Sequence, residues 1–319
     1  MKSIDVNFFP GWTRKSVTFT IDDGNIEMDK KFLDIVKPAG ILGTFNLCHT
    51  KNLSPEEYRA FYRGYEIANH CKNHPIIFRD NIEYKFSDEP CDRDNSSTEY
   101  VYKTETPDVY LMHISLHLED KTKYPKPRGW HSITDEENYK KFADETKADL
   151  ESVFGEGSVR GFVWPHGKQY SQKVVEYFKS QGYNSVRKTG DIRDKTGFSL
   201  PEDRWDWTYN AHNMTLLEVM ELYESYPDDG KLKFFSFGVH SIDFERAGNW
   251  CDLEDFARKY GNRPEDYYYA TVSDIFDYED ATGKIEITDT QIKNPTETTL
   301  YIKVDEKRVI LYPNSTYSI

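Results

Sequence analysis

Three residues in the first quarter of the chain have side chains that could together hold a metal ion. Asp23 follows an apolar run at residues 16–21, and His70 and His74 lie four residues apart. We predict that the two histidines share one turn of helix, where this spacing directs both side chains the same way. One carboxylate and two imidazoles form a ligand set typical of catalytic zinc, with positions left for water and substrate.

Each of these signals also has an ordinary structural explanation. Histidines at this spacing could be solvated or could cap a helix, and the segment Asp22-Asp23-Gly24-Asn25 could be a simple turn. Two adjacent acids at the end of an apolar strand, however, are costly to bury without a compensating cation. The acidic pair therefore favours the metal-site interpretation.

The segments around these residues alternate as they do in a parallel α/β fold. Predicted strands cover residues 16–21, 42–47, 65–68, 161–163, 184–186 and 233–237. Predicted helices cover residues 28–36, 135–154, 172–180, 216–226 and 252–260, and another helix begins at Ser54-Pro55. We expect a distorted (β/α) barrel of about seven parallel strands, with the functional side chains gathered at the carboxyl ends of the strands.

Two regions depart from this alternation. Residues 79–130 are rich in Asp, Glu, Tyr, Ser and Pro, and we predict a long insertion there. After residue 278, three short strand candidates separated by turn residues predict a small β appendage over residues 279–319. Residues 1–278 would then form the catalytic barrel.

Composition argues against several classes of partner. The chain has 41 Lys and Arg against 55 Asp and Glu, a formal net charge of -14, which disfavours nucleic acid and anionic membrane surfaces. No stretch approaches the roughly 18 apolar residues of a membrane span, and the N-terminal segment lacks the apolar run of a signal peptide. The four cysteines have no paired spacing, which favours free thiols. We therefore expect a cytoplasmic protein.

Two later segments follow predicted strands and could take part in hydrolysis. One is Val163-Trp164-Pro165-His166-Gly167, and the other is Gly238-Val239-His240-Ser241. Attack of a metal-activated water on an acyl group needs an acid that protonates the departing amine or alkoxide. His240 is our candidate for that acid, although a lone histidine after a strand more often has a structural role.

The order of these motifs resembles that of the NodB-homology polysaccharide deacetylases, carbohydrate esterase family 4. The segment Thr20-Ile21-Asp22-Asp23-Gly24 is similar to the first family block, which implies that Asp22 is the catalytic base and Asp23 a metal ligand. The segment from Asn69 to His74 is similar to the histidine block, which implies that His70 and His74 are ligands. The resemblance extends from about residue 15 to 275, and the β segment beyond it resembles a bacterial subgroup.

The same resemblance implies roles for the two later segments. Trp164-Pro165-His166-Gly167 is similar to the block that forms one wall of the substrate groove, where the backbone amide of His166 would hold the oxyanion. This implies substrate-binding roles for Trp164, Pro165 and His166. The segment from Gly238 to Ser241 is similar to the last block, which implies that His240 is the general acid.

The chain departs from the family pattern in two places. Val163 stands where many members have an arginine paired with the base, and Arg187, at the end of the next strand, is our candidate to replace it near the substrate. The block whose Asp tunes the acid histidine is best matched by Trp205-Asp206-Trp207. Trp164, Trp205 or Trp207 could stack on a sugar ring or could belong to the core.

The resemblance implies a metal-dependent hydrolase that removes N- or O-linked acetyl groups from a carbohydrate. Zinc is the first candidate for the divalent metal, with other divalent transition metals open. The partner would be an acetylated oligosaccharide or a small acetylated metabolite. Two alternatives stay open: hydrolysis of a non-sugar amide, such as a ureide or imide, and a non-catalytic glycan-binding relative.

Overall fold

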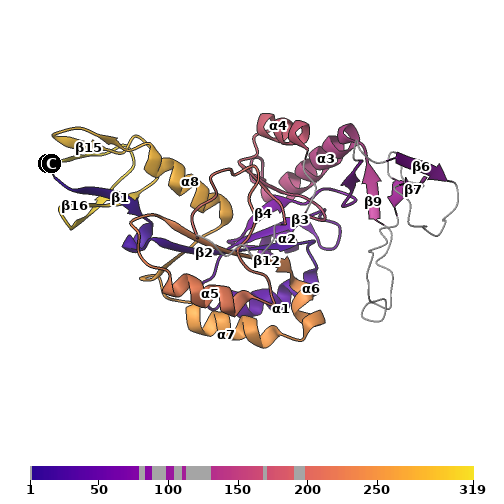
Figure 1. The fold of residues 1–319 in the computed structure, drawn as a ribbon, viewed down its shortest axis with the longest axis horizontal. Helices are drawn as coiled ribbons and strands as arrows, with labels where there is room; N and C mark the ends of the chain where they lie inside the picture. The colour runs from indigo at the N-terminus through magenta and orange to yellow at the C-terminus, as the bar shows by residue number, and fades with distance from the viewer. Residues whose placement is uncertain are drawn as a thin grey trace.

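The computed structural model describes residues 2–78, 83–87, 98–103, 110–112, 131–167, 171–189 and 198–319. Its central element is a curled parallel sheet with the strand order β11-β10-β4-β3-β2-β12 (Figure 1). These strands are β2 (Lys15–Asp22), β3 (Thr44–Leu47), β4 (Glu66–Asn69), β10 (Gly161–Val163), β11 (Ser185–Arg187) and β12 (Lys233–His240). A further strand, β13 (Tyr267–Tyr269), pairs in parallel with the first residues of β2.

The segment 207–211 links the two edges of this sheet. Trp207 forms a parallel bridge to Arg187 in β11, and Ala211 forms one to Phe237 in β12. The sheet thereby curls into the distorted (β/α) barrel that the alternation predicted. Because the strands run parallel, the carboxyl ends of β2, β4 and β12 open on the same side of the barrel.

Helices cover the barrel and carry recognisable start signals. The helix α1 (Ile26–Val36) begins after Asn25, whose side chain accepts a hydrogen bond from the backbone amide of Met28. A capping box between Ser54 and Glu57 starts α2 (Pro55–Phe61). The other helices are α3 (Glu136–Phe154), α4 (Gln172–Ser180), α5 (Leu216–Ser225), α6 (Ser241–Ala247), α7 (Trp250–Tyr260) and α8 (Val272–Gly283). The sequence did not predict α6 and α8.

Aromatic rings pack the strands β2, β3 and β12 against α1. The ring of Phe19 in β2 lies 4.9 Å from that of Phe32 in α1, 5.3 Å from that of Phe45 in β3 and 5.9 Å from that of Phe237 in β12. All four side chains are fully buried. Their packing fixes three strand ends relative to the helix that follows Asp22 and Asp23.

Among the described residues, three smaller sheets lie outside the barrel. One has the order β5-β9-β8-β7-β6 and consists of β5 (Ile76–Ile77), β6 (Glu83–Ser87), β7 (Thr98–Lys103), β8 (Tyr110–Met112) and β9 (His131–Thr134). The rest of the predicted insertion at 79–130 lies outside the described residues.

The other two sheets contain the C-terminal strands and lie at the opposite end of the molecule from β6 and β7 (Figure 1). In one, β1 (Ile4–Phe8) pairs with β16 (Leu300–Val304), which pairs with β17 (Lys307–Leu311). The other joins β14 (Glu286–Ile287), β15 (Gln291–Lys293) and β18 (Thr316–Ser318). The C-terminal region thus has five strands where the sequence suggested three, and its status as a separate appendage stays a prediction.

Within the described part of the chain, no helix is long and apolar enough to cross a bilayer. Cys48, Cys71 and Cys251 have free thiols, whereas Cys91 lies outside the described residues.

Candidate active site

The functional side chains predicted from the sequence meet where three barrel strands end. Asp22 is the last residue of β2 and His240 is the last residue of β12, and the two are direct partners in the register of these strands. Asn46 of β3 is the partner of Asp22 on its other side. The candidate base and the candidate acid therefore stand side by side on neighbouring strands.

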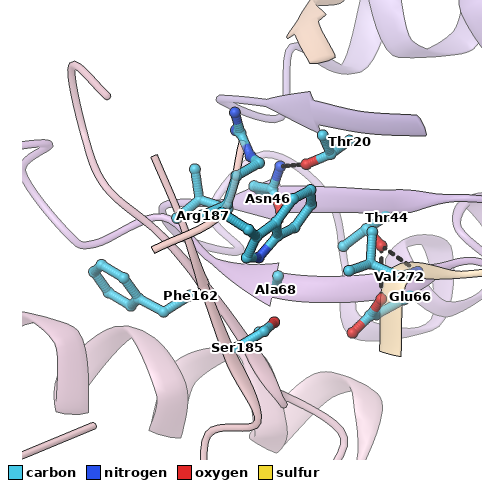
Figure 2. Close-up of a pocket in the computed structure, with 12 residues that line it drawn as sticks. Thr20, Thr44, Asn46, Glu66, Ala68, Phe162, Ser185, Arg187 and Val272 are labelled. Carbon is cyan, nitrogen blue, oxygen red and sulfur yellow. Dashed lines mark hydrogen bonds between the residues drawn. The ribbon is translucent and has the colours of Figure 1, made fainter. Parts of the chain in front are cut away.

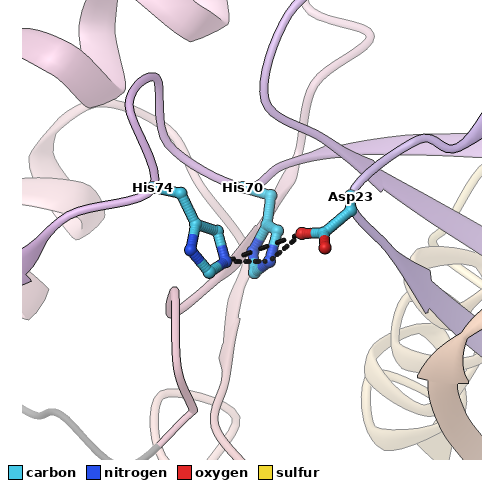
Figure 3. Close-up of side chains that lie close together, drawn as sticks. All are labelled: Asp23, His70 and His74. Atoms are coloured by element: carbon cyan, nitrogen blue, oxygen red, sulfur yellow. Dashed lines mark hydrogen bonds and ion pairs between the residues drawn. The ribbon is translucent and has the colours of Figure 1, made fainter. Parts of the chain in front are cut away.

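Asp23, His70 and His74 converge beside this pair (Figure 3). The Oδ1 atom of Asp23 lies 3.4 Å from Nε2 of His70 and 3.6 Å from Nε2 of His74. The two Nε2 atoms are 3.1 Å apart. One ligand atom from each of the three residues lies within 4.8 Å of the others, so the side chains could hold one metal ion together.

The two histidines reach this position by a turn of backbone and not by a helix. Cys71, Asn73 and His74 have φ values of 57°, 66° and 47°, in the left-handed region, and the amide of His74 donates to the carbonyl of Cys71 at 3.1 Å. The prediction that a helical turn carries His70 and His74 is therefore wrong. Left-handed residues other than glycine cost roughly 1 kcal/mol or more each, and such strain is common at ligand sites.

Asp23 also owes its direction to a left-handed backbone. Its φ is 76°, and that of the following Gly24 is 69°. A Cβ atom on Gly24 would stand 2.6 Å from Cδ2 of Leu47, so only glycine fits this turn without a shift. The change of backbone hand at Asp23 turns its carboxylate away from the barrel interior and toward the histidines.

The surroundings of the histidines favour the forms that bind a metal. His70 is 1% exposed, and its Nδ1 lies 2.9 Å from the carbonyl oxygen of Val163, which leaves Nε2 as the ligand atom. Burial, helped by His70 and His166, lowers the pKa of His74 to about 3 and keeps its imidazole neutral. Nε2 of His166 lies 3.2 Å from the carbonyl oxygen of His74, and the two rings are 4.4 Å apart.

The donor set fits a divalent metal ion. Burial opposes the negative charge of Asp23, but His70, His240 and His74 together lower its pKa below the ordinary range. An ionised carboxylate with neutral imidazole is the combination that metal binding requires. Carboxylate and imidazole ligands suit zinc and other divalent transition metals alike.

Asp22 lies inside the barrel against a buried arginine. Arg187 is 1% exposed, and its Nη2 donates to Oδ1 of Asp22. Nδ2 of Asn46 lies 2.7 Å from the same oxygen and 2.7 Å from Oγ1 of Thr20. Figure 2 shows Arg187, Asn46 and Thr20 together in the barrel interior. Burial opposes the charge of Asp22, but Arg187, His70 and His240 lower its pKa.

The structure thus brings Arg187 to the place that the sequence proposed for it, next to the candidate base. It reaches Asp22 from β11, the neighbour of β10, while Val163 of β10 contributes a backbone carbonyl to His70. The sequence missed Asn46. The feature that could have indicated Asn46 is its position in β3, where it pairs with Asp22 at the end of β2.

His240 is held by a carboxylate that the sequence also missed. Nδ1 of His240 lies 2.8 Å from Oδ2 of Asp243, and the His240 backbone amide donates to the same oxygen at 3.2 Å. Nε2 lies 3.5 Å from Oδ2 of Asp23. Burial would lower the pKa of His240, but Asp243, Asp22 and Asp23 raise it to about 9. The available signal was the three-residue spacing from His240 to Asp243 at a helix start.

The segment Trp205-Asp206-Trp207 does not take part in this contact. Asp206 pairs with Lys188, and the indole of Trp207 packs against Phe234 and Phe276 in a second core cluster. Asp243 therefore occupies the place proposed for Asp206, and that prediction is wrong. The physical reason is that α6 places Asp243 one helical turn from His240.

Of the two roles open to Trp164, the structure assigns its side chain to the core. It is 1% exposed, and its ring lies 5.4 Å from that of Tyr139 and 5.6 Å from that of Phe162. Pro165 is buried as well. His166, half-buried with a φ of 59°, stands nearest to the metal ligands, and its substrate role stays a prediction.

Comparisons with known proteins point to one family. A family model described as polysaccharide deacetylase matches residues 12–186. No curated protein sequence matches the chain.

Several solved structures are similar to the chain. A CE4 esterase from Streptococcus mutans has 15% identity and a TM-score of 0.44, with 81% of this chain and 86% of that chain covered. The peptidoglycan deacetylase PdaC from Bacillus subtilis has 12% identity and a TM-score of 0.44, with coverage of 84% and 92%. A family 4 carbohydrate esterase from Bacillus anthracis has 14% identity and a TM-score of 0.41, with coverage of 86% and 88%.

Proposed function

Because the chain belongs to the polysaccharide deacetylase family, we propose that it is a metal-dependent deacetylase that releases acetate from an acetylated oligosaccharide or a small acetylated metabolite. One observation carries the proposal. The three candidate ligand side chains Asp23, His70 and His74 lie beside a carboxylate held by arginine and an imidazole held by a carboxylate. This is the arrangement that metal-assisted acyl hydrolysis needs.

The residues of the chain divide the proton transfers between them. A divalent ion held by Asp23, His70 and His74 would supply Lewis acidity and would lower the pKa of a coordinated water. Asp22, kept ionised by Arg187, accepts the proton of the attacking water. The amide of His166 is our candidate donor to the oxygen of the acyl group as negative charge develops there.

His240 completes the reaction as the proton donor. As the bond between the acyl carbon and the substrate nitrogen or oxygen breaks, Nε2 of His240 donates its proton to the departing atom. Asp243 bonds to Nδ1 and so fixes which ring nitrogen faces the site. Because Asp22 and His240 are register partners, the proton acceptor and the proton donor lie at the same mouth of the barrel.

Chelation with substrate profiling tests this proposal. Acetate release is measured on chitooligosaccharides, acetylated xylan and simple N-acetylated metabolites, using protein as purified, protein treated with chelator, and protein reloaded with zinc, cobalt or manganese. We expect acetate release to fall at least 100-fold on metal removal and to return on reloading. Loss of a group that only hydrogen-bonds to a metal ligand already costs roughly 10- to 100-fold, and loss of the metal itself should cost more.

Two results would contradict the proposal. Metal-loaded protein that cleaves ureides or imides but no acetylated carbohydrate would identify a non-sugar amidase. Protein that takes up no divalent metal, as measured by elemental analysis after reloading, would instead indicate a non-catalytic relative.

A further inference from the structure

A buried carboxylate outside the metal centre connects the elements that carry the catalytic groups. Asp29 lies in the first turn of α1 and has no exposed surface. Its Oδ1 accepts a hydrogen bond from Oγ of Ser241 at 2.6 Å, and its Oδ2 accepts one from the hydroxyl of Tyr62 at 2.8 Å. Both oxygens are therefore used, as a carboxylate at this depth requires.

The two hydroxyl donors come from different elements of the fold. Ser241 is the first residue of α6 and directly follows His240, and it is fully buried. Tyr62 directly follows α2, and its ring lies 4.8 Å from that of Phe45 in β3. The helix that carries Asp29 itself starts directly after the turn at Asp23 and Gly24. Asp29 thus joins the turn of the metal ligand Asp23 to the residue next to the candidate acid.

We propose that Asp29 is a positioning residue, whose carboxylate holds Ser241 against α1 and so fixes His240 relative to Asp22 and Asp23. This inference rests on the proposed role of His240 as the acid. The contact is short and buried, whereas the other polar tie between α1 and α6, from Lys31 to Glu245 at 2.9 Å, is exposed. Water therefore weakens the Asp29–Ser241 hydrogen bond less than it weakens the exposed ion pair of Lys31 and Glu245.

The ionised form of Asp29 carries a cost in stability. Burial, together with the charge of Asp23, raises the pKa of Asp29 to about 6, although the bonds from Ser241 and Tyr62 work in the opposite direction. A carboxyl whose pKa is raised in the folded state favours folding less as the pH rises through about 6. At pH 8 the ionised side chain therefore costs stability relative to its protonated form.

The test compares substrates that do and do not need an acid. Acetate release is measured for Asp29→Asn, Ser241→Ala and the parent protein on an N-acetylated chitooligosaccharide, whose amine leaving group must be protonated, and on 4-nitrophenyl acetate, whose phenolate leaves unaided. We expect kcat on the oligosaccharide to fall about 10- to 100-fold in both variants, the size of effect that misplacement by about 1 Å produces. Activity on the aryl ester, KM and bound metal should stay within about twofold.

Matched variants separate this effect from general damage. Glu245→Gln removes the exposed tie between the same two helices and should leave the ratio of the two activities unchanged. A loss of equal size on both substrates, or no loss on the oligosaccharide, would overturn the proposal.

Two further measurements keep the inference distinct from the proposed function. If His240→Ala leaves oligosaccharide turnover unchanged, the acid assignment fails, whatever Asp29 does. Crystal structures of Asp29→Asn and Ser241→Ala test the geometry without any activity. A displaced or multiply oriented His240 is expected, and an unmoved His240 in both variants would overturn the positioning role.

Discussion

Asp22 and Asp23 are adjacent in the chain, yet their side chains lie in opposite surroundings. The side chain of Asp22 is 11% exposed and contacts Arg187 and Asn46 inside the barrel. The side chain of Asp23 is 46% exposed and faces three histidines at the barrel mouth. A regular strand delivers the first carboxylate, and a left-handed residue delivers the second.

The difference shows how one strand end can supply two kinds of chemistry. We call Asp22, Arg187 and Asn46 the inner side, and Asp23 with its histidines the outer side. On the inner side, the buried guanidinium of Arg187 offsets the negative charge of Asp22. The outer side gathers the carboxylate of Asp23 and the neutral imidazole of His74, which are forms that bind a divalent cation. We therefore expect variants of the inner side to change catalysis or stability without removing metal, and variants of the outer side to remove metal.

The largest effect is expected from exchanging each carboxylate for an amide. Asp22→Asn should lower kcat by about 100- to 10,000-fold, the usual contribution of a general base, while the bound metal is retained. Asp23→Asn should lose activity to at least the same extent together with the metal. Acetate release and elemental analysis of the purified variants check both.

Asp34→Asn, an exposed position on α1, is the control for this comparison and should change neither quantity. Loss of metal from Asp22→Asn, or full metal content in Asp23→Asn, would show that the two surroundings are not functionally separate.

The next effect in size concerns the stability of the inner side. Arg187→Met leaves the charge of Asp22 buried without its partner, which typically costs about 3 to 5 kcal/mol of unfolding free energy. Adding Asp22→Asn to this variant should restore most of the loss, because no charge then remains to be compensated. Denaturant titration with the bound metal monitored in parallel measures the effect.

Arg263→Met is a suitable comparison, because Arg263 is one-third exposed and its ion pairs with Glu224 and Asp266 are worth only about 1 kcal/mol. An Arg187→Met protein as stable as this control would mean that the inner carboxylate does not depend on its arginine.

The smallest effect is expected at Asp243. Its carboxylate stabilises the protonated imidazole, so Asp243→Asn should lower the pKa of His240 and move the alkaline limb of kcat/KM to lower pH by roughly one unit. Asp22 and Asp23, which also raise this pKa, remain in place. A pH profile from 6 to 10 measures the shift, and an unmoved limb would show that another group controls it.

The sequence predicted the barrel well where local patterns decide the structure. The bounds of β10 and α4 agree with the prediction. An apolar run marks β10, and Ser171 caps the start of α4. The meeting of Asp23, His70 and His74 could be predicted from residue type, since a carboxylate and two spaced histidines together suggest a shared ligand. The turn that joins those histidines could not, because residues 70–74 contain no glycine to signal a left-handed backbone.

Contacts between distant segments account for the rest. Asp243 was missed because α6 has only seven residues, too few for an apolar periodicity to stand out. The pairing of β1 with β16 joins the two ends of the chain, and no local pattern encodes it. Arg187 was predicted only in part. Its position at a strand end could be predicted from the sequence, but its contact with Asp22 depends on the curl of the sheet.

The continuous pairing of β2 with β12 has a consequence for how this scaffold can change. The two strands match residue for residue from Lys15 and Lys233 to Asp22 and His240. Neighbouring strands are held about 4.8 Å apart by their backbone hydrogen bonds, and a slip of one residue would turn every side chain to the other face. The backbone pairing of β2 and β12 therefore fixes the spacing between Asp22 and His240. Laboratory evolution toward other acyl substrates should therefore accumulate changes in the loops around the barrel mouth and leave this strand pair untouched.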